Sequence, residues 1–406
     1  MAITMTFDPT ALFNDYVKNN VEYALQRLQT NNVRTPPLTD QELALQALAF
    51  SLNLASSWPL TRRLLLALAP KMEQSGHRQE WHTYLLEGLH FSQQAGDRRT
   101  EAELRFHLGL LYQLMRRFDD AEKQYEQALE LFKQLDETHG QARTLNRLAI
   151  VARQKRRFDL ALARVEEAES LLAPDDTERA YCYLVRGSLC HDRREWAEAA
   201  GYFRRSLELS EKKRALREMA WGHANLGMAL RHLEQMEESE HHLKQAISLF
   251  DDIGDPVNKA ISLMNLGNLY LTLEEPEKAL DCYRQAEPIF RETQDIMNEA
   301  KVCNNIGMAY RHLKRWNEAV TSYVRSVTLW RQLDNPVLLE NALLGLAIAY
   351  LSQDHKESAR PLLKEAESLL EEIQDPRSQD FFRQELDECL KMLEGTEETA
   401  VVEQER

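Results

Sequence analysis

Three asparagines recur at intervals of 40 residues, at Asn225, Asn265 and Asn305. A primary amide offers two donors and an acceptor, which match the acceptor and donor of a peptide bond. Asparagine is also a poor helix former, so its repetition within helix-like segments indicates a compensating contact. The chemistry expected of these residues is binding of another chain's backbone. The alternative is a structural hydrogen bond inside each repeat.

The asparagines belong to a longer repeat. Each stands two residues before a glycine, and a small residue holds that position in seven successive segments, 40 residues apart except for one interval of 38. These small residues are Gly109, Ala149, Gly187, Gly227, Gly267, Gly307 and Ala347. A second small residue follows 12 positions later and a third seven positions after that, often with a large apolar residue such as Tyr283 between them.

The apolar residues of each segment follow a period near 3.6, and a break midway leaves room for two antiparallel helices of about 14 to 16 residues. Small residues at fixed places let the backbones of neighbouring helices approach closely. Asp or Asn residues that can accept from free backbone N–H groups mark the expected helix starts. These are Asp97, Asp175, Asp255, Asp295, Asn335 and Asp375. The chain is therefore predicted to be all-α and built from helical hairpins.

The heptads ANLGMAL, MNLGNLY and NNIGMAY resemble the first helices of tetratricopeptide repeats (TPR). The 40-residue unit is similar to the longer repeats of Pins and LGN adaptors, kinesin light chain and bacterial TPR sensors. The resemblance implies a right-handed superhelical solenoid. It covers seven repeats over residues 98–376, with a degenerate hairpin at 58–97. Residues 1–57 are expected to be N-terminal capping helices, 377–393 a C-terminal capping helix and 394–406 a disordered acidic tail.

The same resemblance implies where a ligand binds, because part of the first helix faces the concave groove in TPR domains. The candidate groove residues are Asn146, Arg147, Asn225, Arg231, His232, Asn265, Asn268, Lys301, Asn304, Asn305, Arg311 and His312. We expect the asparagines to bind a partner's main chain. The arginines are expected to hold acidic side chains or a terminal carboxylate.

A row of cations in the turns within hairpins is a second candidate surface. It comprises Arg116, Arg117, Lys155, Arg156, Arg157, Arg193, Arg194, Lys314 and Arg315. A basic edge could meet an acidic partner or nucleic acid. The structural interpretation is favoured, because cations suit the C-terminal ends of helices and acids follow at the start of the next helix.

Composition excludes several classes of function. The 65 acidic residues against 50 Lys and Arg give a net charge of −15, which disfavours nucleic acid and anionic membranes as partners. The five cysteines are scattered without metal-ligand spacing, and the start MAITMTFDPT lacks a signal peptide, which together indicate a cytoplasmic protein. No apolar stretch is long enough to span a membrane.

No motif for catalysis, a cofactor or a metal is recognisable. The segment HRQEWH has its histidines at the wrong offsets for a zinc helix. The sequence therefore predicts a non-enzymatic scaffold or adaptor that binds an extended or helical, acidic segment of a protein partner. Two alternatives stay open: a bacterial TPR regulator that senses a short peptide or acts through its N-terminal helices, and a structural subunit of a larger complex.

Overall fold

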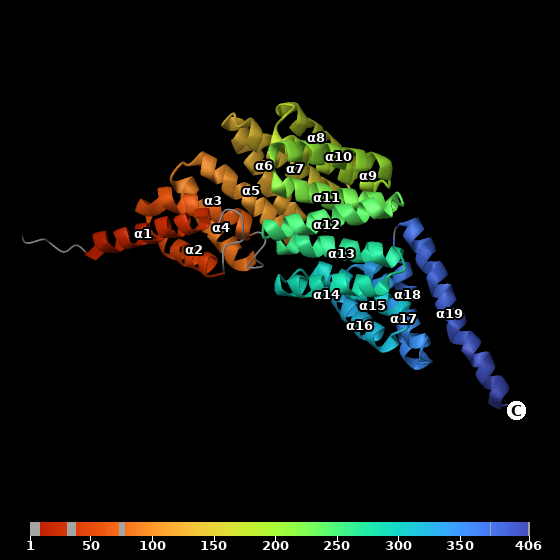
Figure 1. Cartoon of the computed structure of the whole chain (residues 1–406). Helices are drawn as coiled ribbons and strands as arrows, with labels where there is room; N and C mark the ends of the chain where they lie inside the picture. The colour runs from red at the N-terminus through yellow and green to blue at the C-terminus, as the bar shows by residue number, and fades with distance from the viewer. Residues whose placement is uncertain (1–8, 31–37, 73–77, 374, 405–406) are drawn as a thin grey trace, which may run out of the picture. The chain divides into compact units, whose positions relative to one another are not determined.

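The computed structural model describes residues 9–30, 38–72, 78–373 and 375–404. In these ranges every regular element is a helix (Figure 1), so the chain is all-α as predicted. Parts of the expected N-terminal cap (1–8 and 31–37), of the degenerate hairpin (73–77) and of the acidic tail (405–406) lie outside the described residues.

The chain divides into two units, Met1–Pro256 and Val257–Arg406. The first unit contains α1 (Pro9–Thr30), α2 (Leu38–Ser51), the 3₁₀ helix η1 (Ala55–Ser57), α3 (Trp58–Met72), α4 (Arg78–Gln94), α5 (Arg98–Leu114), α6 (Phe118–Gln134), α7 (Thr138–Gln154), α8 (Phe158–Leu171), α9 (Thr177–Asp192), α10 (Trp196–Lys213), α11 (Leu216–His232) and α12 (Met236–Asp252). The second contains α13 (Pro256–Thr272), α14 (Pro276–Glu292), α15 (Ile296–His312), α16 (Trp316–Gln332), α17 (Pro336–Leu351), α18 (Lys356–Leu370) and α19 (Pro376–Gln404).

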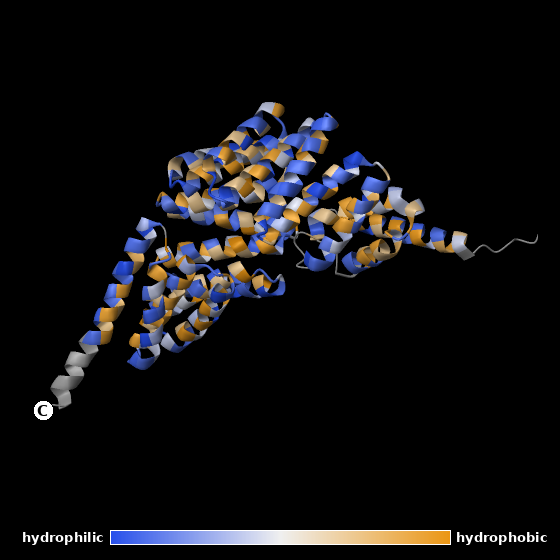
Figure 2. Ribbon diagram, turned by 180° about the vertical axis from the view of Figure 1, so that it is seen from behind, coloured by the Kyte–Doolittle hydropathy of each residue, from blue (hydrophilic) through white to orange (hydrophobic). Residues whose placement is uncertain are grey.

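From α5 onward the helices pair into hairpins, with one first helix and one second helix in each repeat. Figure 2 shows polar and apolar residues distributed around each helix, as expected of amphipathic helices in a stack. Consecutive first helices contact one another, α7 with α9 and α9 with α11 in the first unit, and α15 with α17 in the second. First helices of neighbouring repeats therefore lie side by side and can form a shared surface.

The repeated glycines make room for an aromatic ring on the second helix. A Cβ atom added to Gly267 would lie 2.4 Å from Cε1 of Tyr283, and one added to Gly187 would lie 2.4 Å from Cε1 of Phe203. Where the chain has Ala149 in place of glycine, the residue 16 positions later is the smaller Val165. In these hairpins the size of the small residue and the size of its partner are matched, whereas Gly227 faces the aliphatic Leu243.

Most helix starts agree with the predicted caps. The Asp97, Asp295 and Asn335 side chains each accept a hydrogen bond from the backbone N–H three residues later. For α9 the predicted cap is off by one residue, because Asp176 accepts from the backbone of Glu178. Asp175 instead accepts from Nζ of Lys213 at 2.9 Å.

The turns between helices use a left-handed backbone conformation at non-glycine residues. Arg116, Arg156, Arg194 and Lys314 have φ between 56° and 63°. Glu274 has φ 58° in an equivalent turn, so the left-handed position of the turn also accepts an acidic residue. A left-handed residue at the helix C-terminus satisfies carbonyls that would otherwise lack partners. Nothing in the sequence pattern pointed to this conformation, since glycine is the usual residue there.

Helix α19 covers the last hairpin of the second unit. Phe382, Leu386, Cys389 and Leu393 are buried along one side of it, and α19 contacts both α17 and α18. The sequence predicts that this helix ends at residue 393, before a disordered tail. The structure instead continues α19 through Gln404.

Two adjacent phenylalanines test the contribution of α19. Phe382 is 5% exposed and Phe381 is 54% exposed. We expect Phe382→Ala to destabilise the second unit by about 3–5 kcal/mol, because it removes a buried ring, and Phe381→Ala to change stability by less than about 0.5 kcal/mol. Urea unfolding followed by circular dichroism measures both. Equal effects of the two substitutions would show that α19 does not pack against the repeats in solution.

Candidate functional site

A pocket of about 220 Å³ opens on the face formed by the first helices of the second unit. Its lining comes from α13, α15, α16 and α17. The lining residues are Met264, Asn268, Lys301, Asn304, Asn305, Trp330, Leu338 and Asn341. Four of the predicted groove residues, Asn268, Lys301, Asn304 and Asn305, thus meet at one place.

Asn268 links α13 to α15. Its Oδ1 accepts from the Tyr283 hydroxyl at 2.7 Å and from Asn305 Nδ2 at 2.8 Å. The two bonds occupy the acceptor of Asn268 and a donor of Asn305. Within the described ranges, no hydrogen bond engages Asn268 Nδ2 or Asn305 Oδ1. The pair therefore presents a donor and an acceptor on neighbouring helices.

Asn304 is buried at the pocket, with 9% of its surface exposed. Its Nδ2 points to the Met308 sulfur at 3.7 Å, a weak contact, while its Oδ1 has no hydrogen-bond partner among the described residues. A buried polar oxygen without a partner costs about 1–3 kcal/mol. This cost is removed if a ligand in the pocket donates to Asn304.

The repeat shows which partner Nδ2 of Asn304 has lost. Asn146 occupies the equivalent place, three residues before the small residue, and is fully buried between α7 and α9. Its Nδ2 donates to Glu178 Oε1 at 2.8 Å and to Cys182 Sγ at 3.3 Å. The residue equivalent to Glu178 in the next hairpin after Asn304 is Leu338, which cannot accept a hydrogen bond.

This comparison corrects the expectation that Asn146 faces a ligand groove. Its side chain has no exposed surface and joins two helices, as the structural alternative supposed. Arg147 beside it stacks on the Tyr181 ring at 4.5 Å from the ring centroid and donates to the Tyr181 hydroxyl. These two residues therefore have structural contacts in the first unit.

The other asparagines of the row differ from one another. Asn225 is half-buried on α11 and donates to the Trp221 carbonyl of its own helix at 2.8 Å. Asn265 is half-buried on α13, outside the residues that line the pocket, and no hydrogen bond of its side chain occurs within the described part of the chain. The fixed 40-residue spacing therefore does not give these side chains one common contact.

The remaining cationic candidates lie near the ends of first helices. His232 stacks on Trp196 with ring centroids 4.1 Å apart, and burial, with Arg231 next to it, lowers the pKa of His232 to about 4. Arg311 is half-buried and makes no ion pair within the described ranges, and His312 is exposed. Arg311 is not among the residues that line the pocket, and its charge acts on Tyr323 and on Cys389 of α19.

The sequence did not predict the apolar residues that line the pocket, or the residue that orients Asn268. Trp330, 1% exposed, and Leu338 shape the pocket, and Tyr283 fixes the orientation of Asn268. The repeat pattern predicts only a packing role for Tyr283. Its position opposite Gly267 could have suggested that its hydroxyl reaches the first helix.

The cations of the basic edge are largely paired. Lys155 Nζ lies 2.5 Å from Asp119 and 2.6 Å from Glu122 of the preceding hairpin. Arg117 and Arg315 form ion pairs with an acid three residues later in the next helix. These contacts support the structural interpretation of the row.

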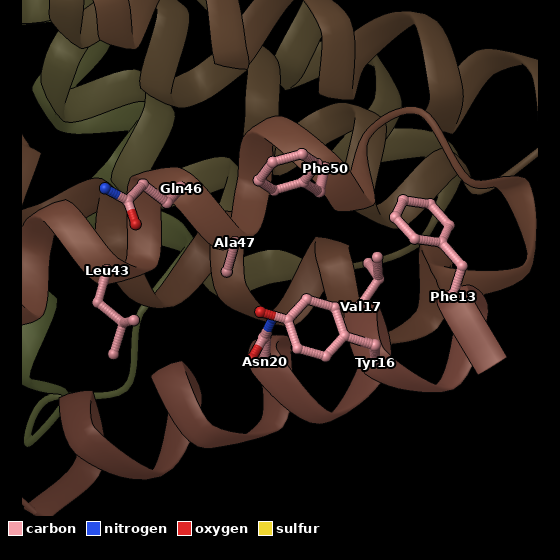
Figure 3. Close-up of a pocket in the computed structure, with 8 residues that line it drawn as sticks. All are labelled: Phe13, Tyr16, Val17, Asn20, Leu43, Gln46, Ala47 and Phe50. Carbon is pink, nitrogen blue, oxygen red and sulfur yellow. The ribbon is translucent and has the colours of Figure 1, made fainter.

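A second, more apolar pocket lies between α1 and α2, with a volume of about 290 Å³. Figure 3 shows its lining from both helices, including the aromatic rings of Phe13, Tyr16 and Phe50. These three side chains are 49%, 63% and 57% exposed. Exposed aromatic side chains gathered in this way are typical of contact surfaces.

Two buried thiols of the core are not activated as nucleophiles. Burial raises the pKa of Cys182 and of Cys303 to about 12, so both remain protonated near neutral pH. Among the described helices, none is both long enough and apolar enough to cross a membrane.

Comparison with known proteins decides the family. The Tetratricopeptide repeat sequence model matches residues 100–173, 218–292 and 298–372, which is more than half of the chain, and a second model of the same description matches residues 187–216. The chain belongs to the tetratricopeptide-repeat family. It is thus an all-α TPR solenoid, as the heptads implied. A search of curated protein sequences finds no match.

Solved structures share the TPR fold at low identity. A Rap protein complexed with Competence and Sporulation Factor is 15% identical, with a TM-score of 0.54 over 82% of this chain and 98% of its own. A signal-transduction ATPase with a TPR sensor, from Pyrococcus horikoshii, is 17% identical, with a TM-score of 0.57 over 80% of this chain and 54% of its own. The apo form of RapI is 15% identical, with a TM-score of 0.50 over 71% of this chain and 99% of its own.

Proposed function

We propose that this TPR protein is a non-enzymatic scaffold or adaptor that binds an extended or helical segment of a partner protein. The partner's segment lies along α13, α15 and α17 of the second unit and enters the pocket at Asn268, Asn304 and Asn305. All five cysteines are free thiols, which fits the reducing, cytoplasmic setting of the proposal.

The unpartnered Oδ1 of Asn304 is the observation on which this proposal depends most. In another repeat, Nδ2 of the equivalent Asn146 donates to Glu178 and Cys182, while its Oδ1 has no hydrogen-bond partner among the described residues. At Asn304 the neighbour is Leu338, and the amide faces a pocket instead. A ligand that donates a hydrogen bond offsets the cost of the buried oxygen.

A polypeptide segment suits the rest of the pocket. Asn268 Nδ2 can donate to a backbone carbonyl, and Asn305 Oδ1 can accept from a backbone N–H. Met264, Trp330 and Leu338 supply apolar surface for a side chain of the segment. Lys301 lines the pocket and Arg311 lies near the end of the same helix, so an acidic side chain in the segment is favoured. The Rap protein solved in complex with Competence and Sporulation Factor shows that one protein of this fold holds a bound factor.

An affinity test begins with capture of a partner and an array of peptides from it. We expect Asn268→Ala combined with Asn305→Ala to weaken binding of the strongest peptide by roughly 5- to 150-fold, because each lost amide contact contributes about 0.5–1.5 kcal/mol. Fluorescence anisotropy with the labelled peptide measures the change. The helices should persist, because alanine is the better helix former.

Asn225→Ala is the matched control. It removes an asparagine from the same place in the repeat as Asn305, but its amide is bonded to its own helix. Unchanged affinity in this control and lower affinity in the double variant support the pocket. If the double variant binds the peptide as tightly as the native chain, the partner binds elsewhere.

The pocket between α1 and α2 favours a second candidate, in which the N-terminal helices regulate a partner's activity. Its exposed aromatic side chains could contact such a partner. In that case Tyr16→Ser with Phe50→Ser would abolish capture of the partner, and the asparagine variants would not.

A further inference from the structure

Two histidines meet across the hairpin of α11 and α12 in the first unit. The Nδ1 atoms of His223 and His242 are 2.8 Å apart, so one ring donates a hydrogen bond to the other. His223 is 8% exposed and His242 is half-buried. Two imidazole nitrogens therefore converge on one point at the edge of the core.

The fold brings the same two positions together in other repeats. In the hairpin of α5 and α6, the equivalent Arg105 donates to Gln124 at 3.3 Å. The remaining equivalent pairs are Leu145 and Arg164, Tyr183 and Tyr202, Leu263 and Cys282, Cys303 and Ser322, and Leu343 and Leu362. The pair of imidazoles is therefore a feature of this one hairpin, at two positions whose side chains are also in contact in the α5–α6 hairpin.

The spacing of the two nitrogens suits a shared metal ion. Zinc binds imidazole nitrogen at about 2.0–2.1 Å in tetrahedral geometry, which separates two such ligands by about 3.4 Å. Small rotations of the two rings would open the observed gap to that value. The ion would replace the proton that the rings now share.

A third ligand must come from a side chain that now lies more than 4.8 Å from at least one of the two rings, because the three do not yet form one group of ligand atoms. Glu238 stands four residues before His242 on α12, and hence on the same face of the helix. Its Oε2 lies 3.7 Å from Nη2 of Arg204 on α10, and its side chain is 62% exposed. His241 is exposed and packs edge-on against His242 with ring centroids 5.5 Å apart.

We infer that His223 and His242 bind a divalent transition-metal ion such as Zn²⁺ through their Nδ1 atoms, with Glu238 as the third ligand. Water completes the coordination. The ion joins the two helices of the α11–α12 hairpin. Glu238 must turn away from Arg204 to bind, so Arg204 weakens the site.

Isothermal titration of the full chain with ZnCl₂ at pH 7.5 tests this site, and Co²⁺ absorption reports tetrahedral coordination. We expect His242→Gln and His223→Gln each to lower Zn²⁺ affinity at least about tenfold. Glu238→Gln should weaken binding and Arg204→Gln should strengthen it. Circular dichroism shows whether each variant folds. If His223→Gln does not fold, the Zn²⁺ affinity of His242→Gln tests the site.

Cys190 provides the matched control, because its thiol lies with the carboxylates of Glu195 and Glu198 in a separate group of possible ligands within 4.8 Å. We expect Cys190→Ser to bind Zn²⁺ like the native chain. Absence of Zn²⁺ binding by the native chain, or equal binding by His242→Gln, would overturn the proposal. Loss of binding in Cys190→Ser with retention in His242→Gln would also overturn it and place the ion at the cysteine.

Discussion

Replacing Glu340 by alanine is expected to stabilise the second unit by about 1–3 kcal/mol at pH 9. Glu340 is 0% exposed on α17, and neither of its carboxyl oxygens has a hydrogen-bond partner among the described residues. Six other repeats have a buried alanine at this place: Ala102, Ala142, Ala180, Ala220, Ala260 and Ala300. The fold therefore accommodates alanine here, and a buried unpaired carboxylate costs free energy.

The gain should depend on pH. Burial, and then the nearby Glu365, raises the pKa of Glu340 to about 8 from a model-compound value of 4.5. Between these two values the folded chain holds a proton that the unfolded chain has released, so the stability of the native protein falls as pH rises through this window. Below pH 4.5 both states are protonated and the residue adds no further dependence.

Urea unfolding of native protein, Glu340→Ala and Glu340→Gln from pH 5 to pH 9 measures this. Glutamine keeps the size of the side chain but cannot ionise. We expect both variants to lose the decline in stability that Glu340 causes. If native protein and Glu340→Gln show the same pH dependence, Glu340 is solvated rather than buried without a partner.

The second large effect concerns Gly267. We expect Gly267→Ala to destabilise the second unit by about 1–3 kcal/mol, because the new methyl group would meet the Tyr283 ring at 2.4 Å. Displacing that ring also disturbs the hydrogen bond from Tyr283 to Asn268, so peptide affinity should fall as well. Thermal unfolding and fluorescence anisotropy measure the two consequences.

Two comparisons sharpen this prediction. Gly201 lies within α10 with nothing within 4 Å of an added Cβ, so Gly201→Ala should stabilise the chain by about 0.5–1 kcal/mol. Gly267→Ala combined with Tyr283→Leu should be less destabilising than the sum of the single changes, because Ala347 and Leu363 already form such a pair. If the destabilisation of the double variant equals the sum of the two single effects, Gly267 is not needed to make room for the Tyr283 ring.

The fold could be predicted because one contact recurs. Small residues at fixed spacing, with large apolar residues opposite the glycines, specify a hairpin and its neighbour, and the Tetratricopeptide repeat match confirms that interpretation. Turn conformations could not be predicted, since residues such as Arg156 and Glu274 hold left-handed φ values without glycine.

The candidate site could be predicted only in part. Asn146 and Asn304 have the same place in the repeat and the same residue type, yet Asn146 bonds to Glu178 and Asn304 faces a pocket. The difference comes from Leu338 in the following hairpin. Single-residue periodicity does not carry that information, because a side chain's role depends on the residue that meets it across the next helix.

Hydrogen–deuterium exchange of the full chain, with and without a bound partner peptide, tests most directly where the partner binds. Our account predicts slower exchange on binding in the segments around residues 264–268, 301–305 and 338–341, which carry most of the pocket's lining, and little change in α1 and α2. Protection confined to α1 and α2, with none in those three segments, would contradict the proposed binding site.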